Sequence, residues 1–160
     1  MPDTTVADLL DPAGGVCEIA ADLASLTDAL RLAPGLIVPL VEDLASMRLV
    51  AELGADALSG ARRALGGNVR ELRASDLARG AVTCELSDTP EAALAIMRAR
   101  RRSVLHVVDR NGRLCGSISI ERAYLHSDPV ARQENAPGSL RTAITATLPR
   151  FAAHAARAAW

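Results

Sequence analysis

The chain has 160 residues, of which 49% are hydrophobic, enough to bury a core as one domain or as two small repeats. Its formal net charge of −1 gives no general attraction to nucleic acid or to an anionic membrane surface. Aromatic residues make up only 2% of the chain, which argues against a stacking surface for single-stranded nucleic acid. The 18 basic residues are all arginine, a usage typical of bacteria with GC-rich genomes.

The sequence also bears on cellular location and on metal binding. The longest apolar run, Gly35 to Val41, is far too short to span a bilayer, and the N-terminus lacks the basic residues that begin a signal peptide. Cys17, Cys84 and Cys115 are odd in number and widely spaced, so they predict neither a disulfide framework nor a metal site. We therefore expect a cytoplasmic protein with no membrane association and no metal.

The first half of the sequence predicts a strand, a helix, two strands and a second helix. In chain order the expected elements are a strand at 16–19, a helix at 22–32, a strand at 36–43 and a strand leading into a helix over 48–58. Gly66 and Gly67 then interrupt the chain, which is typical of a helix end or a linker.

The second half repeats this order with clearer signals. The expected elements are a strand at 81–86, a helix from Asp88, a β-hairpin over 103–120 and a helix from about Glu121. Pro90 and Glu91 near the start of the first helix are typical of a capped helix N-terminus. Asn111 followed by Gly112 between two apolar runs is a strong hairpin signal.

A polar linker leads to a final predicted helix at the C-terminus. Leu140, Ile144, Leu148 and Phe151 recur there at helical spacing, and Pro149 is expected to kink or restart the helix. Its polar face is not basic enough for a membrane anchor, so we expect a packing or dimerisation helix.

The two halves read as copies of one unit, offset by roughly 64 to 68 residues. The repeated β-α-β-β-α order, Pro39 in "IVPLV", the "VVDRNGRLCG" hairpin, Gly116 and Ser119 resemble the CBS domain, and two copies resemble the tandem CBS pair, or Bateman module. The resemblance implies an α/β (α+β) fold in which two repeats pack as a pseudo-twofold pair. The expected division is repeat 1 at 5–64, a linker at 65–74, repeat 2 at 75–126, and a linker with a C-terminal helix at 127–160.

The resemblance further implies a regulatory protein and not an enzyme. CBS pairs commonly bind AMP, ADP, ATP or another adenosyl ligand between the repeats, and commonly form homodimers. The ligand-binding residues expected from the resemblance are Pro39, Asp56, Thr83, Val104, His106, Gly116, Ser119, Glu121 and Arg122.

One position departs from the family pattern. The family motif G-x-x-[ST]-x-x-D reads Gly116, Ser119 and Arg122 in the second copy, so an arginine stands where the ribose-binding aspartate is expected. The first copy lacks all three motif residues, although Asp56 lies one position from the expected aspartate. Because arginine has no acceptor for a ribose hydroxyl, either the site is lost or its ligand differs.

Several residues have both a functional and a structural interpretation. Arg122 and Ser119 at a helix start could bind a phosphate or carboxylate, or be a surface arginine and a capping serine. The arginines at 98 and 100–102 are more typical of a solvated helix end than of a phosphate clamp. His106 is more typical of a half-buried strand histidine than of a pH sensor.

Three functions remain open from the sequence. The first is a stand-alone regulatory CBS-pair protein that senses an adenine nucleotide. The second is a dimeric interaction scaffold with a decayed nucleotide site and an unknown protein partner. The third is an enzyme using Cys84 or Cys115 with His106 or His126, which lacks a nucleophile and base at recognisable spacing.

Overall fold

The computed structural model describes residues 4–128, except for the side chains at positions 67 and 69. The described residues up to Ser127 form one compact unit. The helix predicted for the C-terminal segment lies outside the described residues. Within the described part of the chain, no helix has the length and apolar character needed to cross a membrane.

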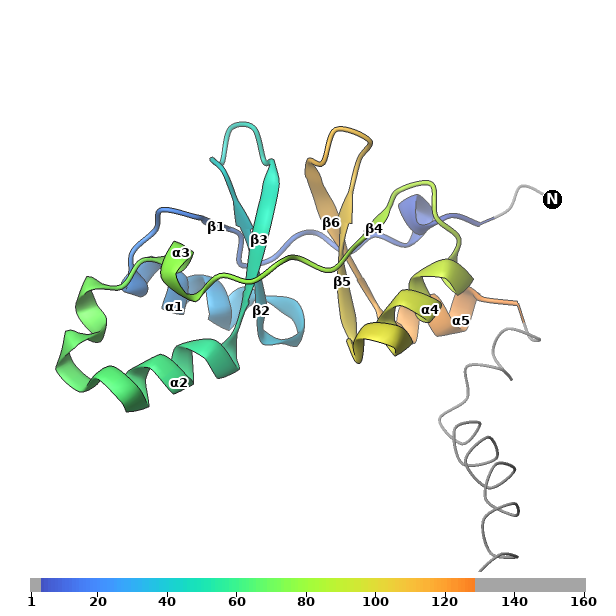
Figure 1. Ribbon diagram of the computed structural model, residues 1–160. Helices are drawn as coiled ribbons and strands as arrows, with labels where there is room; N and C mark the ends of the chain where they lie inside the picture. The colour runs from blue at the N-terminus through green and yellow to red at the C-terminus, as the bar shows by residue number, and fades with distance from the viewer. Residues whose placement is uncertain (1–3, 129–160) are drawn as a thin grey trace, which may run out of the picture. The chain divides into compact units, whose positions relative to one another are not determined.

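Two three-stranded sheets organise the compact unit (Figure 1). In the first sheet, β1 (Cys17–Glu18) runs parallel to β2 (Ile37–Val41), which pairs antiparallel with β3 (Leu49–Gly54). In the second sheet, β4 (Thr83–Glu85) runs parallel to β5 (Val104–Val108), which pairs antiparallel with β6 (Leu114–Ser119). The two sheets have the same strand order and pairing, so the mixed α and β fold predicted from the repeat is confirmed.

Helices accompany both sheets. The first sheet is followed or flanked by α1 (Leu23–Leu32), α2 (Ala55–Leu65) and α3 (Ala74–Leu77), and the second by α4 (Pro90–Arg100) and α5 (Ile120–His126). Three 3-10 turns complete the unit: η1 (Val6–Leu9), η2 (Pro34–Leu36) and η3 (Gly66–Glu71). Figure 1 shows α1 and α2 beside the first sheet and α4 and α5 beside the second.

The start of α4 differs by one residue from the prediction. Thr89, not Asp88, is the N-cap, because the Thr89 hydroxyl accepts a hydrogen bond from the backbone N–H of Ala92 at 3.2 Å. The Asp88 carboxylate instead accepts the N–H of Glu85 at 2.8 Å and closes the turn between β4 and α4. Asp88 and Thr89 are therefore both used, but for different purposes.

Each sheet has its own hydrophobic core, and we use these cores to define two halves of the unit. The first core includes Leu26, Leu40 and Leu53, and the second includes Met97 and Leu105. Val6 and Leu9 of η1 lie in the second core although the strand and helix that follow them belong to the first half, and Ala74 of α3 still lies in the first core. The chain therefore crosses between the halves at its start and again before β4, which ties the two halves together.

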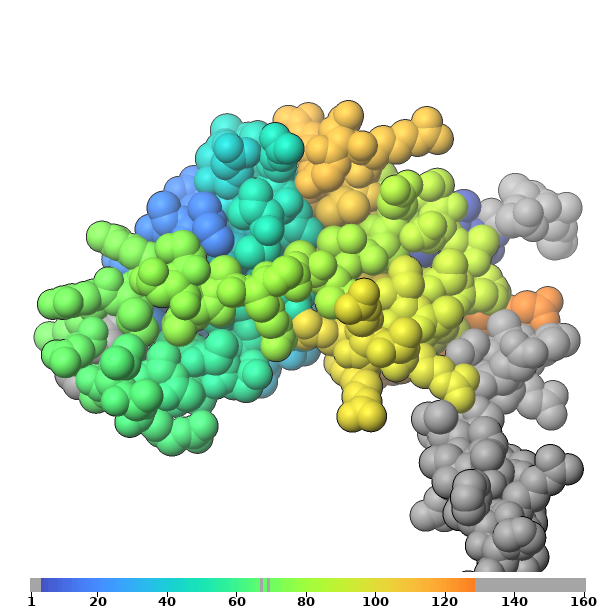
Figure 2. Space-filling model, viewed as in Figure 1, coloured from blue at the N-terminus to red at the C-terminus, as the bar shows by residue number. Residues whose placement is uncertain are grey.

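The halves also meet at their hairpins and through a connector, residues 78–82. The N–H of Leu49 donates to the carbonyl of Gly112 at 3.0 Å, and the N–H of Leu114 donates to that of Met47 at 2.8 Å. The connector follows β3, because Arg79 and Glu52 exchange both backbone hydrogen bonds at 2.9 Å. Figure 2 shows the chain around the connector as a yellow-green band across the face between the halves.

We predict that Gly60→Ala stabilises the protein. Gly60 lies inside α2, and no heavy atom lies within 4 Å of the position that an added Cβ would take. Alanine in a helix interior is favoured over glycine by about 0.5–1 kcal/mol, so urea unfolding should show a gain of that size. Gly112→Ala is the matched control: it also meets no neighbour, but its φ of +74° disfavours any side chain, so it should lose stability. A loss with Gly60→Ala would contradict the prediction.

Candidate functional site

The junction between the halves brings together four buried positions, one from each hairpin strand. Pro39 of β2 pairs with Glu52 of β3, and His106 of β5 pairs with Ser117 of β6. All four residues are buried. In the aligned repeats Pro39 corresponds to His106, and Glu52 corresponds to Ser117. Each equivalent pair of positions thus has one ionisable and one neutral residue. The junction therefore contains a single ionisable pair, Glu52 and His106, whereas two identical repeats would contribute either no such pair or two.

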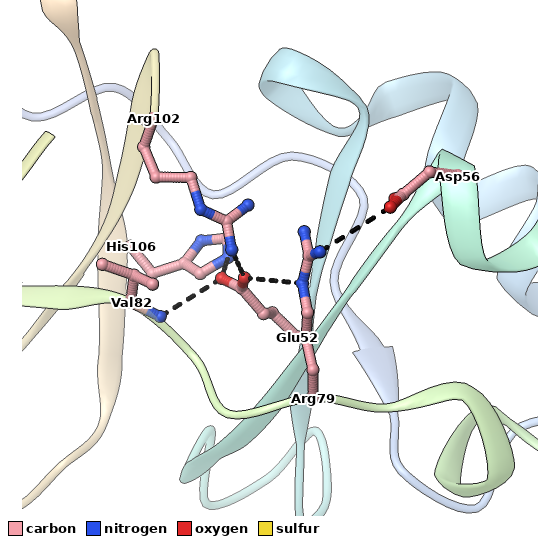
Figure 3. Close-up of polar contacts among 6 residues, drawn as sticks. All are labelled: Glu52, Asp56, Arg79, Val82, Arg102 and His106. Atoms are coloured by element: carbon pink, nitrogen blue, oxygen red, sulfur yellow. Dashed lines mark hydrogen bonds and ion pairs between the residues drawn. The ribbon is translucent and has the colours of Figure 1, made fainter. Parts of the chain in front are cut away.

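A cluster of polar groups surrounds the buried carboxylate of Glu52 (Figure 3). The cluster consists of Glu52, Arg79, Val82, Arg102 and His106. Arg79 Nε donates to Glu52 Oε1 at 3.1 Å, and Arg102 Nη2 donates to the same oxygen. The backbone N–H of Val82 donates to Oε2 at 3.2 Å, and His106 Nε2 lies 3.4 Å from that oxygen. We call this set the Glu52 cluster.

The Glu52 carboxylate is held in its ionised form. Its side chain is only 2% exposed, and burial alone would raise its pKa. The hydrogen bonds from His106 and from the Val82 N–H, together with the charge of Arg102, outweigh burial and hold the pKa of Glu52 below its usual range. The cluster joins β3 of the first half to the connector and to β5 of the second half, so a charge–charge contact fixes the junction.

The junction also contains a small cavity. Its lining residues are Ala13, Gly14, Pro34, Pro39, Val104, His106, Gly116 and Ser117. Four residues predicted to bind a ligand are thus brought together: Pro39, Val104, His106 and Gly116. Side chains fill the cavity so closely that no water-sized space remains. An adenine nucleotide needs a pocket of about 300 Å³ or more, so this cavity would have to open before it could bind one.

Arg122 is engaged by the N-terminal segment of the chain. Its guanidinium lies 3.1 Å from Asp11 Oδ1 and donates to the carbonyls of Leu9 and Leu10 at 3.3 and 3.4 Å. Asp11 also exchanges backbone hydrogen bonds with Ser117 of β6, at 2.9 and 3.0 Å. We call the contact between Asp11 and Arg122 the N-terminal clasp. The side chain at the family's aspartate position therefore binds an internal anion in this structure.

The remaining predicted site residues lie apart from the small cavity. Ser119 is the N-cap of α5 and accepts the backbone N–H of Arg122 at 3.3 Å, the structural alternative given above. Glu121 is exposed in the first turn of α5. Asp56 is exposed in the first turn of α2, 3.8 Å from Arg79 Nη1. Thr83 begins β4 beside His106 of β5 and follows Val82 of the Glu52 cluster.

The two halves use ion pairs of opposite polarity at equivalent places. In the first half, Arg79 of the connector pairs with Asp56 of α2. In the second half, Asp11 of the N-terminal segment pairs with Arg122 of α5. The arrangement is the same in both halves. The segment that pairs with the third strand (β3 or β6) supplies one charged residue, and the first turn of the helix after that strand (α2 or α5) supplies its partner. The arginine at position 122 is thus matched by an aspartate that the sequence motif does not include.

Three charged residues of this region were missed by sequence reasoning. Glu52 could have been noticed as a carboxylate at an inward position of the apolar run "LVAEL", which requires a buried partner. Arg79 and Asp11 carry no such signal, because they lie in connecting segments whose positions depend on the tertiary fold.

The arginines at 98 and 100–102 differ in exposure. Arg98, Arg100 and Arg101 are exposed as predicted. Arg102 is only 13% exposed and binds Glu52, so the solvated interpretation is wrong there.

Two of the three cysteines are core residues. Cys17 and Cys84 are buried at equivalent strand positions, and Cys115 is exposed. Burial raises the pKa of the Cys84 thiol to about 12, and burial also raises the pKa of Cys115. Because the thiolate is the nucleophilic form, these environments oppose cysteine catalysis near neutral pH.

We predict that Arg122→Ala loosens the N-terminal segment without unfolding the protein. The substitution removes every contact of the N-terminal clasp but leaves the backbone pairing of Asp11 with Ser117. Amide hydrogen exchange at Asp11 should accelerate, whereas exchange within β2 and β3 should not change. Arg48→Ala, an exposed arginine near the hairpin tips, is the control. Equal exchange at Asp11 in both variants would contradict a restraining role for Arg122.

The fold and the junction define a class of protein, in which two small α/β units share a polar interface. The family model of the CBS domain matches residues 69–123. A comparison with curated proteins finds no match. Residues 69–123 are therefore a CBS domain, and the order of elements in the first half is consistent with a tandem CBS pair.

Solved structures, a CBS domain protein among them, share the fold of most of the chain. A CBS domain protein from Pyrobaculum aerophilum complexed with AMP is 21% identical, with a TM-score of 0.64 over 83% of this chain and 98% of that chain. Hypoxic Response Protein I with two coordinated zinc ions is 17% identical, with a TM-score of 0.64 over 78% of this chain and 100% of that chain. The cytosolic domain of the Mg²⁺ channel MgtE in complex with ATP is 21% identical, with a TM-score of 0.60 over 74% and 46%.

Proposed function

We propose that the protein is a regulatory CBS-pair protein that senses an adenine nucleotide or a related adenosyl ligand between its two halves. In this proposal, residues 5–64 and 75–126 are the two repeats, and the protein acts as a cytoplasmic homodimer on a protein partner. The proposal is supported by structural neighbours described as complexes with AMP and ATP. CBS domains are regulatory modules, so no catalytic residue is assigned.

The Glu52 cluster is the observation that carries this proposal. It gathers two guanidinium groups, one imidazole and one backbone N–H at the junction between the halves. These are the donors that phosphate groups require. Asp56 lies next to Arg79 on the exposed side of the cluster and offers a carboxylate that can accept hydrogen bonds from ribose hydroxyls.

A thermal-shift series tests the proposal. AMP, ADP, ATP and S-adenosylmethionine would be compared at millimolar concentration with GTP as the control nucleotide. A ligand that binds only the folded protein raises its thermal midpoint, by an amount that corresponds to about 2.7 kcal/mol when its concentration is 100 times its Kd. Stabilisation by one adenosyl ligand but not by GTP would support the proposal. Flat curves with every ligand would overturn it.

The second candidate function is an interaction scaffold with no nucleotide site. The filled cavity beside Pro39 and the engagement of Arg122 by Asp11 favour it. In that case the segment from Pro137 onward, which lies outside the described residues, would carry the docking function. Deleting it should abolish dimerisation or partner binding, and an unchanged oligomer with an unchanged partner would exclude the scaffold.

A further inference from the structure

The Glu52 cluster has an unusual balance of charge for a buried site. Its two carboxylate oxygens face donors from four different positions, which are Arg79, Val82, Arg102 and His106. Glu52 is the only anion of the cluster, and it is supplied by the opposite half of the unit from Arg102 and His106. A free anion with two or three oxygens would find the same donors around it.

Strand pairing does not require a carboxylate at this place. The equivalent residue of the second sheet is Ser117, which is buried and neutral in the same register opposite His106. A serine therefore satisfies the strand geometry, and the carboxylate of Glu52 has to be explained by the donors it faces. It neutralises the largely buried guanidinium of Arg102 and shares the more exposed Arg79 with Asp56.

The cluster is open to solvent on one side. Arg79 is 41% exposed, whereas Arg102 is 13% and Glu52 only 2% exposed. Arg79 Nη1 points toward Asp56 at the start of α2, as Figure 3 shows, and Asp56 is 76% exposed. The exposed Arg79 is therefore the side from which an anion would approach the donors, and the Glu52 side chain would have to turn away to make room.

We propose that these donors form an anion-binding site that Glu52 occupies in this structure, and that a phosphate group binds there by displacing the Glu52 carboxylate. The inference rests on the proposed function and deepens it, because it names the group that is recognised and the residue that regulates access. Glu52 acts as an internal competitor of the phosphate group for these donors. A nucleoside without a phosphate makes no contact with them, so its affinity does not depend on Glu52. Affinity for a phosphate-bearing ligand should rise when the charge of Glu52 is removed.

The test is a calorimetric titration of the full chain with AMP, adenosine and inorganic phosphate. Wild type would be compared with Glu52→Gln and with Glu85→Gln, a matched change at an exposed glutamate of β4. We expect Glu52→Gln to bind AMP at least tenfold more tightly than wild type, with adenosine unchanged and Glu85→Gln equal to wild type. An equal Kd for AMP in wild type and Glu52→Gln would overturn the inference and leave the proposed function standing.

The inference and the proposed function can fail separately. If no adenosyl ligand of the thermal-shift series and no adenosine binds any variant, the proposed function is overturned, and inorganic phosphate decides the inference. A higher thermal midpoint of Glu52→Gln in phosphate, absent in wild type and in Glu85→Gln, would support the anion site, and no such rise would overturn it. If Glu52→Gln does not fold, Glu52→Asp replaces it: the charge stays but the shorter side chain competes less, so phosphate should stabilise this variant more than wild type.

Discussion

Glu52→Ala should be among the most destabilising single substitutions in the described part of the protein. It removes the anion of the Glu52 cluster and leaves Arg102 facing His106. The Arg102 side chain is 13% exposed and the His106 side chain is 6% exposed. Removing one partner of a buried ion pair typically costs about 3–5 kcal/mol, because the remaining charge stays buried without compensation. Urea unfolding of wild type and variant would measure this loss.

Two controls separate the cluster from a general effect of losing a glutamate. Glu85→Ala removes an exposed carboxylate from β4 and should change the free energy of unfolding by less than about 0.5 kcal/mol. The double variant Glu52→Ala/Arg102→Ala should lose less stability than the sum of the two single variants, because each single change already breaks the same contact. Additive losses would contradict a direct coupling of Glu52 with Arg102.

The same cluster predicts how stability depends on pH. The folded pKa of Glu52 lies below its ordinary value, so its ionised form is favoured by folding. This contribution is complete above the ordinary glutamate pKa of about 4.3 and is lost as pH falls through the folded pKa. The difference in unfolding free energy between wild type and Glu52→Ala should therefore shrink as pH is lowered from about 5 to 3. A difference that stays constant over that range would contradict the assignment of the charge.

Local signals in the sequence predicted the local structure well. Asn111-Gly112 specifies the second hairpin, because Gly112 adopts the positive φ that this short turn needs. The first half has no Asn-Gly signal, and its strand order was predicted from its similarity to the second half. The one-residue error at the start of α4 arose because Asp88 and Thr89 are both good caps, and the choice depends on the turn that precedes the helix.

The contents of the junction were harder to predict, because they depend on contacts between distant segments. Glu52, Arg79 and Arg102 come from three separate parts of the chain, and no spacing in the sequence connects them. The substitution at Arg122 was visible as a departure from a motif. Its partner, Asp11, lies in the N-terminal segment, which packs beside β6 of the second half before the chain crosses to the first half. A motif comparison can therefore show which residue is unusual, but not which residue compensates for it.

Gly116→Ala is expected to disrupt this crossing. A Cβ at Gly116 would lie 2.5 Å from the backbone carbonyl oxygen of Asp11 and 3.1 Å from Leu10 Cδ2. The carbonyl cannot retreat without breaking its hydrogen bond from the N–H of Ser117. Overpacking of this kind typically costs about 1–3 kcal/mol, and here it acts on backbone, so we expect a loss at the upper end of that range together with faster amide exchange at Ser117.

The first half shows that the strand itself tolerates the extra methyl group. Ala51 occupies the position in β3 that Gly116 occupies in β6, so the expected cost arises from the N-terminal segment and not from the sheet. Gly80→Ala is the matched control, since no heavy atom lies within 4 Å of its added Cβ. If Gly116→Ala displaces the N-terminal segment, the small cavity lined by Pro39 and His106 should become accessible, because Gly116 and Ser117 form part of its wall. Equal stability and equal exchange at Ser117 in the two glycine variants would show that the close approach of Asp11 does not hold that cavity shut.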